Sequence, residues 1–154
     1  MSRLDTKSFK RDLKKLKKGV NKGITKGNEK ATESLLNTIL ERTAKSRGLK
    51  GTFPKYTKEY AKRKKSKKVD LRVSGDMLDS LRVTKRQNNT MLIEFADKKQ
   101  EKKAEGVSEK RPFMGYTKKE WREFQKTFGK EFKRHIWVLK QVIEKTSPKI
   151  LSRR

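Results

Sequence analysis

The sequence predicts an α+β fold in which long amphipathic helices at the two ends of the chain pack on a small antiparallel sheet with a β-hairpin. Apolar residues recur every three or four positions in 6–44 and again after 117, which is the spacing of one helix face. Between these segments, two alternating runs flank Asn88-Asn89, as in a hairpin. We expect one structural domain, made of an N-terminal helix (1–48), a helix, hairpin and turn region (49–116) and a C-terminal helix (117–154).

The N-terminal helix is expected from Thr6 to about Ala44. Gly19, Gly23 and Gly27 lie within it at a spacing of four, and each costs ~1 kcal/mol relative to alanine in a helix interior. Two interpretations stay open: the glycines let a second helix approach closely, or they mark a bend or a frayed first half. The apolar or small residues of this helix face are Phe9, Leu13, Leu16, Val20, Ile24, Gly27, Ala31, Leu35 and Ile39.

The first helix should end in a loop over 46–54, with Gly48 as its C-terminal cap. A short helix is expected next, with Tyr56 and Tyr60 on one face. Its positive charges form either a solvated loop or a surface facing phosphates, because clustered Lys and Arg release counterions from a nucleic acid without any base contact. We call these residues the basic cluster: Lys62, Arg63, Lys64, Lys65, Lys67 and Lys68.

Another short helix is expected after Ser74, whose hydroxyl can accept hydrogen bonds from the free N–H groups at the helix start, with Asp76 near the positive end of the helix. Its apolar residues are Met77, Leu78 and Leu81. The alternating runs 81–87 and 90–96 then form the hairpin, since asparagine tolerates the positive φ that a tight turn needs.

The stretch 97–109 is almost wholly charged, so we expect a connector on the outside, with its conformation left open. In Arg111-Pro-Phe-Met-Gly115, a proline of fixed φ precedes two large apolar residues and a glycine that can turn the chain. This segment is expected to be a rigid turn that leads into the final helix.

The final helix should begin with Thr117 as its N-cap, and Glu120 completes a capping box. It should stop near Ser147-Pro148. Trp137 and Val138 lie off its apolar stripe and are candidates to face a neighbouring subunit. The stripe itself, expected to be core, consists of Trp121, Phe124, Phe128, Phe132, Ile136, Leu139 and Ile143.

Composition indicates a small core and an anionic partner. Only 31% of the residues are hydrophobic, and 45 Lys and Arg against 18 Asp and Glu give a net charge of +27. Folded copies therefore repel one another unless a nucleic acid or acidic neighbours neutralise them. The absence of cysteine excludes disulfides and thiolate metal sites. No apolar run approaches the ~20 residues that cross a bilayer, so no membrane partner is expected.

Catalysis has no good candidate residues. His135 is the sole histidine and has no partner spaced as in a catalytic triad or a metal site. Asp76 and Asp79 are more simply a helix-start charge and an arginine partner. We therefore expect a protein that is not an enzyme and that has no cofactor and no metal.

Taken in order, these parts resemble the neck and tail-completion proteins of tailed bacteriophages, also known as virion morphogenesis proteins. The resemblance covers roughly residues 55–130. It rests on a lysine-rich approach with Tyr60-Ala61, the block Leu71-Arg-Val-Ser-Gly-Asp-Met-Leu-Asp-Ser-Leu81 that follows it, the hairpin end at 93–96, and Gly106 followed by the Arg-Pro-Phe-Met-Gly turn. The long amphipathic N-terminal helix also belongs to it. One departure is the stretch 96–106, which is longer and more charged than the tyr-ala-x-x-his-x-x-gly run usual in that family.

The resemblance implies a structural virion protein that forms a ring at the head-to-tail neck or at the tail end, through which DNA passes. Its expected partners are copies of itself, portal or connector proteins, tail-tube or tail-terminator proteins, and the phosphates of genomic DNA. It would be made in the host bacterial cytoplasm and reside in the virion. The alternative is a cytosolic, sequence-nonspecific nucleic-acid-binding protein. The basic cluster would face DNA, and the expected interface residues are Met77, Leu78, Arg111, Pro112, Phe113, Met114 and Trp137.

Overall fold

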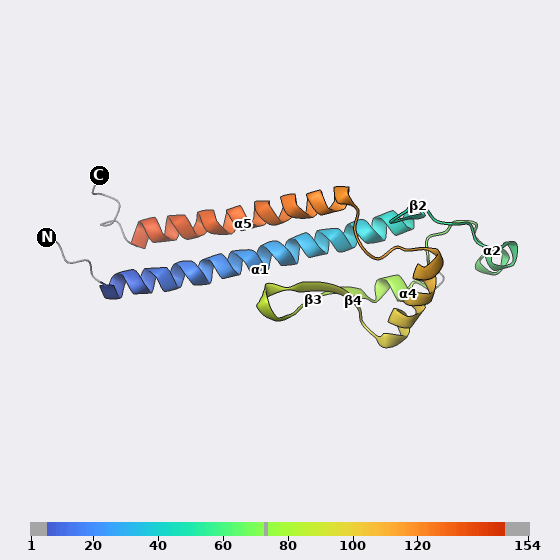
Figure 1. Ribbon diagram of the computed structural model, residues 1–154, viewed down its shortest axis with the longest axis horizontal. Helices are drawn as coiled ribbons and strands as arrows, with labels where there is room; N and C mark the ends of the chain where they lie inside the picture. The colour runs from blue at the N-terminus through green and yellow to red at the C-terminus, as the bar shows by residue number, and fades with distance from the viewer. Residues whose placement is uncertain (1–5, 73, 147–154) are drawn as a thin grey trace.

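The computed structural model describes residues 6–72 and 74–146, and it confirms the predicted α+β class (Figure 1). The helices are α1 (Thr6–Ala44), α2 (Lys58–Lys64), α3 (Asp76–Asp79), α4 (Lys98–Lys110) and α5 (Lys118–Thr146). The strands are β1 (Arg47–Gly48), β2 (Gly51–Thr52), β3 (Leu81–Lys85) and β4 (Met91–Phe95), with a 3-10 turn at Gln87–Asn89. They pair as two separate two-stranded antiparallel sheets, β1 with β2 and β3 with β4.

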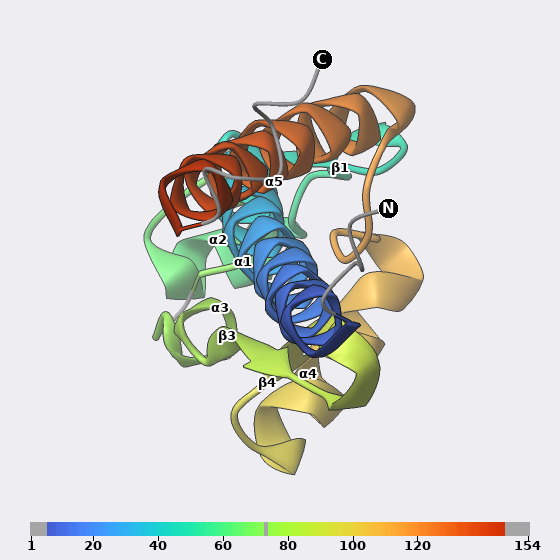
Figure 2. The ribbon, with the colours of Figure 1, turned by 90° about the vertical axis from the view of Figure 1, so that its left-hand side faces the viewer.

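Helix α1 is the spine of the molecule. The view along it in Figure 2 shows α5 on one side and the β3–β4 hairpin on the other. In Figure 1, α5 runs antiparallel to α1, and the helix pair extends well past the hairpin. We call this extension, α1 before Thr25 and α5 after Gly129, the arm. The remaining elements gather at the other end of α1, and we call this part of the subunit the body.

The three glycines of α1 lie where α5 approaches most closely. A β-carbon added at Gly19 would lie 2.5 Å from the Leu139 side chain, and one at Gly27 would lie 2.8 Å from the Phe128 ring. At Gly23, between them, an added β-carbon would also touch α5. Helix α1 runs unbroken through all three positions. The close-approach interpretation is therefore confirmed, and α5 packs against a groove that glycine makes possible.

The cap of α1 differs from the prediction. Ser46, with φ of 59°, takes the left-handed position after the helix, so the assignment of Gly48 as the cap is wrong. Gly48 instead pairs with Gly51 in the small β1–β2 hairpin. A β-carbon at Gly48 would lie 2.5 Å from the Phe53 ring and 2.5 Å from the Pro112 carbonyl oxygen. The glycine is required for close packing against its own hairpin at Phe53 and against the turn at Pro112, which is distant in sequence.

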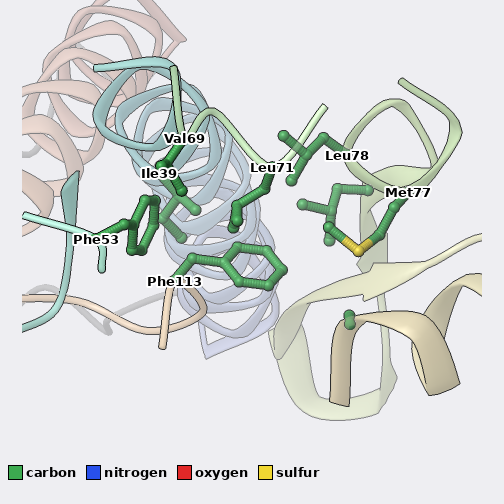
Figure 3. Close-up of a cluster of buried hydrophobic side chains, with 9 residues drawn as sticks. Ile39, Phe53, Val69, Leu71, Met77, Leu78 and Phe113 are labelled. Atoms are coloured by element: carbon green, nitrogen blue, oxygen red, sulfur yellow. The ribbon is translucent and has the colours of Figure 1, made fainter. Parts of the chain in front are cut away.

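The hydrophobic core lies beside the last turns of α1 (Figure 3). Phe113 is 0% exposed and Leu78 is 1% exposed, while Met77 lies next to them. The assignment of Phe113 and Leu78 to an interface is therefore wrong, because the subunit itself covers them. Met77 keeps 9% of its surface exposed and lines a hollow, so it stays a predicted interface residue. The buried hydrophobic residues of the cluster are Ile39, Phe53, Val69, Leu71, Met77, Leu78, Leu81, Ala104 and Phe113.

The aromatic stripe of α5 packs less deeply than predicted. None of its described side chains is buried, and Trp121 is 39% exposed. The reason is that α1 is the main element covering α5, so the stripe has one neighbouring layer where a core residue has several. The prediction that the stripe is core is wrong in this respect. The side chains of Val138 and Ile143 and the predicted stop at Ser147-Pro148 lie outside the described residues.

The hairpin is confirmed. Strands β3 and β4 pair in the register Leu81 to Phe95, and both loop asparagines, Asn88 and Asn89, have the positive φ expected of them, 55° and 60°. The loop is anchored to α1, where the Asn28 side-chain amide donates to the Asn89 carbonyl oxygen at 3.0 Å. This contact fixes where the arm begins.

Around α3 the details differ. Gly75, with φ of 94°, precedes the helix and gives no side-chain cap, while the Ser74 hydroxyl donates to the Asp76 carboxylate at 2.7 Å. Ser74 is therefore not the N-cap. Leu81 begins β3 and does not belong to the helix.

The charged stretch left open by the sequence forms α4. Asp97 is its N-cap and accepts from the Gln100 backbone N–H at 2.9 Å. Ala104 and Gln100 are buried against the core, so one face of the segment points inward and the rest lies outside as expected.

The capping box at the start of α5 is confirmed and is tied to α1. The Glu120 carboxylate accepts from the Thr117 backbone N–H at 2.6 Å and from Arg42 at 2.6 and 2.7 Å. Arg42 also donates to the carbonyl oxygens of Phe113 and Gly115. Burial alone would raise the pKa of Glu120, but Thr117 and Arg42 outweigh it and hold the pKa below its ordinary value. Arg42 thus clamps the turn that delivers Phe113 to the core.

Candidate nucleic-acid interface

The basic cluster lies on and after α2, which projects from the end of the molecule opposite the arm (Figure 1). Thr57 caps the start of α2 by accepting from the Tyr60 backbone N–H. Lys65, with φ of 55°, ends the helix in the left-handed conformation and turns the chain sharply. This turn brings the lysines that follow the helix back beside those on it.

The result is a lysine-lined hollow of about 670 Å³. None of its lining residues in the described part of the chain is acidic, so the positive potentials of its lysines add and favour an anion. We call it the lysine hollow, and its basic residues are Lys55, Lys58, Lys62, Lys65 and Lys67. Sequence reasoning missed Lys55 and Lys58. Lys58 was detectable, because it lies four residues before Lys62 and so shares its helix face.

Lys64 does not belong with the exposed members of the cluster. Its ammonium pairs with the Asp70 carboxylate, and its side chain is only 8% exposed. Burial alone would lower the pKa of Lys64, but the hydrogen bond that its ammonium donates to Asp70 and the nearby Tyr56 raise the pKa above its ordinary value. The assignment of Lys64 to a DNA-facing role is therefore wrong. Its charge holds the segment that follows α2 back against α2.

The other five members of the basic cluster are exposed. The Arg63 guanidinium lies 5.0 Å from the centre of the Tyr60 ring, which fixes its position without neutralising its charge. Lys68 is exposed outside the lysine hollow. The structure therefore brings together three of the six predicted residues, Lys62, Lys65 and Lys67, around one hollow.

Among the predicted interface residues, Trp137 is the most accessible, at 63% exposed. Arg111, Pro112 and Met114 are partly buried and are used within the subunit. The Arg111 guanidinium donates to the Pro54 and Lys55 carbonyl oxygens, and the Pro112 carbonyl oxygen accepts from a backbone N–H before β2. The Arg-Pro-Phe-Met-Gly turn thus closes the body of the subunit.

The arm exposes large apolar side chains, and sequence reasoning identified only Trp137 among them as accessible. Phe9 is 55% exposed, Leu13 48% and Leu16 40%, and Trp137 lies on the α5 side of the same arm. We call these four residues the arm apolar set. The periodicity that predicted the helix carries no information about whether a partner covers the face, which is why exposure was missed.

The carboxylates considered as catalytic candidates have local partners. Asp79 accepts from Arg72 at 2.6 Å, and Asp76 accepts from the Ser74 hydroxyl at 2.7 Å. Among the described residues, no group of three or more His, Cys, Asp or Glu side chains could hold a metal ion. The described part of the chain also has no helix with the length and apolar character needed to cross a membrane.

Comparison of the chain with protein-family models, with curated proteins and with solved structures gave no match.

Proposed function

We propose that this protein is a structural subunit of a tailed-bacteriophage virion that forms a ring at the head-to-tail neck or at the tail end, through which DNA passes. The resemblance of its motif blocks to neck and tail-completion proteins suggests this function. The observation that carries it is the arm, whose large apolar side chains stay exposed in the single subunit.

The arm is incomplete by itself. Two antiparallel helices bury only the stripes that face each other, and each Å² of apolar surface left in water forgoes about 25 cal/mol. A neighbouring subunit would cover the arm apolar set and recover that free energy. Ring symmetry supplies the same neighbour at every position, so one interface repeated around an axis completes every arm.

The charge determines what else the assembly needs. Each subunit carries +27, so adjacent copies repel one another until anions offset the charge. DNA in the bore would do so through the lysine hollow, and lysine contacts to phosphates are blind to sequence. Acidic surfaces of portal, tail-tube or tail-terminator proteins would do so at the ring faces. The subunit would act without a cofactor and would not be an enzyme.

A second function, that of a cytosolic sequence-nonspecific nucleic-acid-binding protein, is favoured by the lysine hollow alone. It leaves the arm without a role. The two proposals therefore differ in whether the arm apolar set is needed.

Locating the protein decides between them. Immunogold electron microscopy of purified tailed particles, with an antibody raised against this chain, should label the neck or the tail end. A parallel fractionation of infected cells measures how much of the chain stays outside particles. Particles free of the chain, with all of it bound to nucleic acid in the cell extract, would contradict the virion assignment and favour the second function.

A further inference from the structure

A second hollow, separate in character from the lysine hollow, lies between α4 and the segments that carry α2 and α3. Its volume is about 960 Å³, and its apolar lining includes Leu71, Met77 and Val107. Leu71 and Met77 belong to the hydrophobic core, so the hollow reaches down to the core from outside. We call it the α4 groove.

Cations surround the groove, and none of the described residues that line it is acidic. Three of them, Lys102, Lys103 and Lys110, come from α4 and are exposed. The acidic residues of α4 recur at 101, 105 and 109 and are absent from the lining. Helix α4 therefore separates its charges and presents the positive ones to the groove. An occupant must carry negative charge at the rim and apolar groups at the floor.

The aromatic rings of the groove are poorly placed to stack on nucleobases. The Tyr56 ring already has the Arg111 guanidinium and the Lys64 ammonium each 4.9 Å from its centre. The Tyr60 ring has Arg63 at 5.0 Å and packs against Tyr56 at 4.7 Å. Base stacking on aromatic faces is the usual contribution to binding of single strands. A floor of aliphatic and methionine side chains instead suits the apolar side chains of a peptide.

We propose that the α4 groove binds an acidic peptide segment of a partner protein. Apolar side chains of the segment contact Leu71, Met77 and Val107, and its carboxylates pair with the lysines of α4. Charge complementarity selects the segment, and the apolar contacts hold it. This inference does not depend on the virion assignment.

Gly106 gives a direct way to block the groove. It lines the groove on α4, and a β-carbon added there would have nothing within 4 Å. Gly106→Phe should therefore fill the groove without disturbing the packing of α4. Gly129 on α5 is the matched control, since it is also a helical glycine with nothing within 4 Å of an added β-carbon, and it does not line the groove.

The test uses three labelled probes with the full chain. The first is a 12-residue peptide of glutamates with leucine or phenylalanine at every third or fourth position. The second is the same peptide with serine at the apolar positions, and the third is a 12-nucleotide oligothymidylate. Fluorescence anisotropy measures binding of each probe to the wild type, Gly106→Phe and Gly129→Phe. Methyl NMR of methionine, with Met77 at the floor and Met91 on the hairpin, reports where a probe binds.

We expect the apolar-acidic peptide to bind the wild type and Gly129→Phe equally and Gly106→Phe at least tenfold more weakly. The serine peptide should also bind at least tenfold more weakly, and the Met77 methyl signal should shift while that of Met91 does not. Equal binding of both peptides, no peptide binding, or insensitivity to Gly106→Phe would overturn the proposal. The proposal would also be overturned if Gly106→Phe weakened binding of the oligothymidylate more than binding of the peptide, because the groove would then be a nucleic-acid site. The proposal would likewise be overturned if Gly106→Phe lost the self-association of the wild type, because a second copy of this chain would then be the occupant of the groove.

Discussion

The body of the subunit and the arm treat similar side chains in opposite ways. Phe113 in the body is 0% exposed, whereas Phe9 in the arm is 55% exposed. In the body, one hydrophobic cluster receives side chains from four elements, α1, α3, β3 and α4. The loop that precedes α2 and the turn that precedes α5 contribute to the same cluster. The arm has two helices. The difference teaches that a phenylalanine is buried where several elements converge and stays exposed where two helices pack alone, and we propose that a partner covers the arm.

The largest expected effect comes from truncating the two phenylalanines in turn. Phe113→Ala should lower the free energy of unfolding by about 3 to 5 kcal/mol, because it opens a cavity in a packed core. Phe9→Ala should change it by less than about 0.5 kcal/mol, as for other exposed positions. Urea denaturation of both variants measures this. Equal losses would mean that the arm and the body are stabilised alike and would remove the contrast.

The second effect concerns the Arg42 clamp, which joins the body to the start of α5. Arg42→Met should lower the free energy of unfolding by about 3 kcal/mol, since it leaves the Glu120 carboxylate and two carbonyl oxygens without their partner. Pairing it with Glu120→Gln in a double-mutant cycle should recover part of that loss. Strictly additive single and double variants would show that the two side chains do not act together.

The third effect is a pH dependence that belongs to the body. The pKa of Asp70 is lowered in the folded state, since the Lys64 and Arg72 hydrogen bonds outweigh burial, which alone would raise it. A lowered folded-state pKa gives stability that is present above the unfolded pKa and is lost as pH falls through the folded pKa. Asp70→Asn should therefore cost about 1 kcal/mol at neutral pH and flatten the decline below about pH 4. Urea midpoints between pH 7 and pH 3 measure this, and an unchanged acid decline would contradict it.

The smallest effect on stability, and the clearest on binding, concerns the lysine hollow. Replacing its residues Lys58, Lys62, Lys65 and Lys67 with glutamine should leave unfolding unchanged within about 0.5 kcal/mol. The slope of log binding constant against log salt for duplex DNA should become shallower by about 3 to 4, if each lysine contacts one phosphate.

The matched control for that variant removes the same charge elsewhere. It replaces four other exposed residues, Lys98, Lys99, Lys118 and Lys119, with glutamine. The control should keep most of the salt slope. Equal loss in both variants would mean that total charge, and not the hollow, sets DNA binding.

Local signals predicted the parts of the fold that depend on neighbours in sequence. The bounds of α1, the positive φ of Asn88 and Asn89, and the Thr117–Glu120 capping box all follow from side-chain chemistry within a few residues. The left-handed cap at Ser46 was missed because glycine at position 48 offered a stronger local signal. Close packing against Phe53 in the same hairpin and against the distant Pro112 carbonyl oxygen accounts for that glycine instead.

The site could be predicted only in part for the same reason. A run of lysines indicates charge but not direction, so Lys64 was grouped with exposed neighbours although Asp70 holds it inward. The α4 groove was not predicted, since it forms between segments that the sequence reading treated separately. Two of its lining lysines, Lys102 and Lys103, lie in a stretch whose conformation was left open. The exposure of the arm depends on what covers it, which periodicity does not report.

The central claim is that identical neighbours complete the arm. A photo-crosslinking amino acid in place of Leu13, incorporated into the chain as it assembles into particles, tests this directly. We predict covalent dimers and longer ladders of this chain in purified particles after illumination. Particles that contain the protein but yield no chain-to-chain crosslink from that position would contradict the claim.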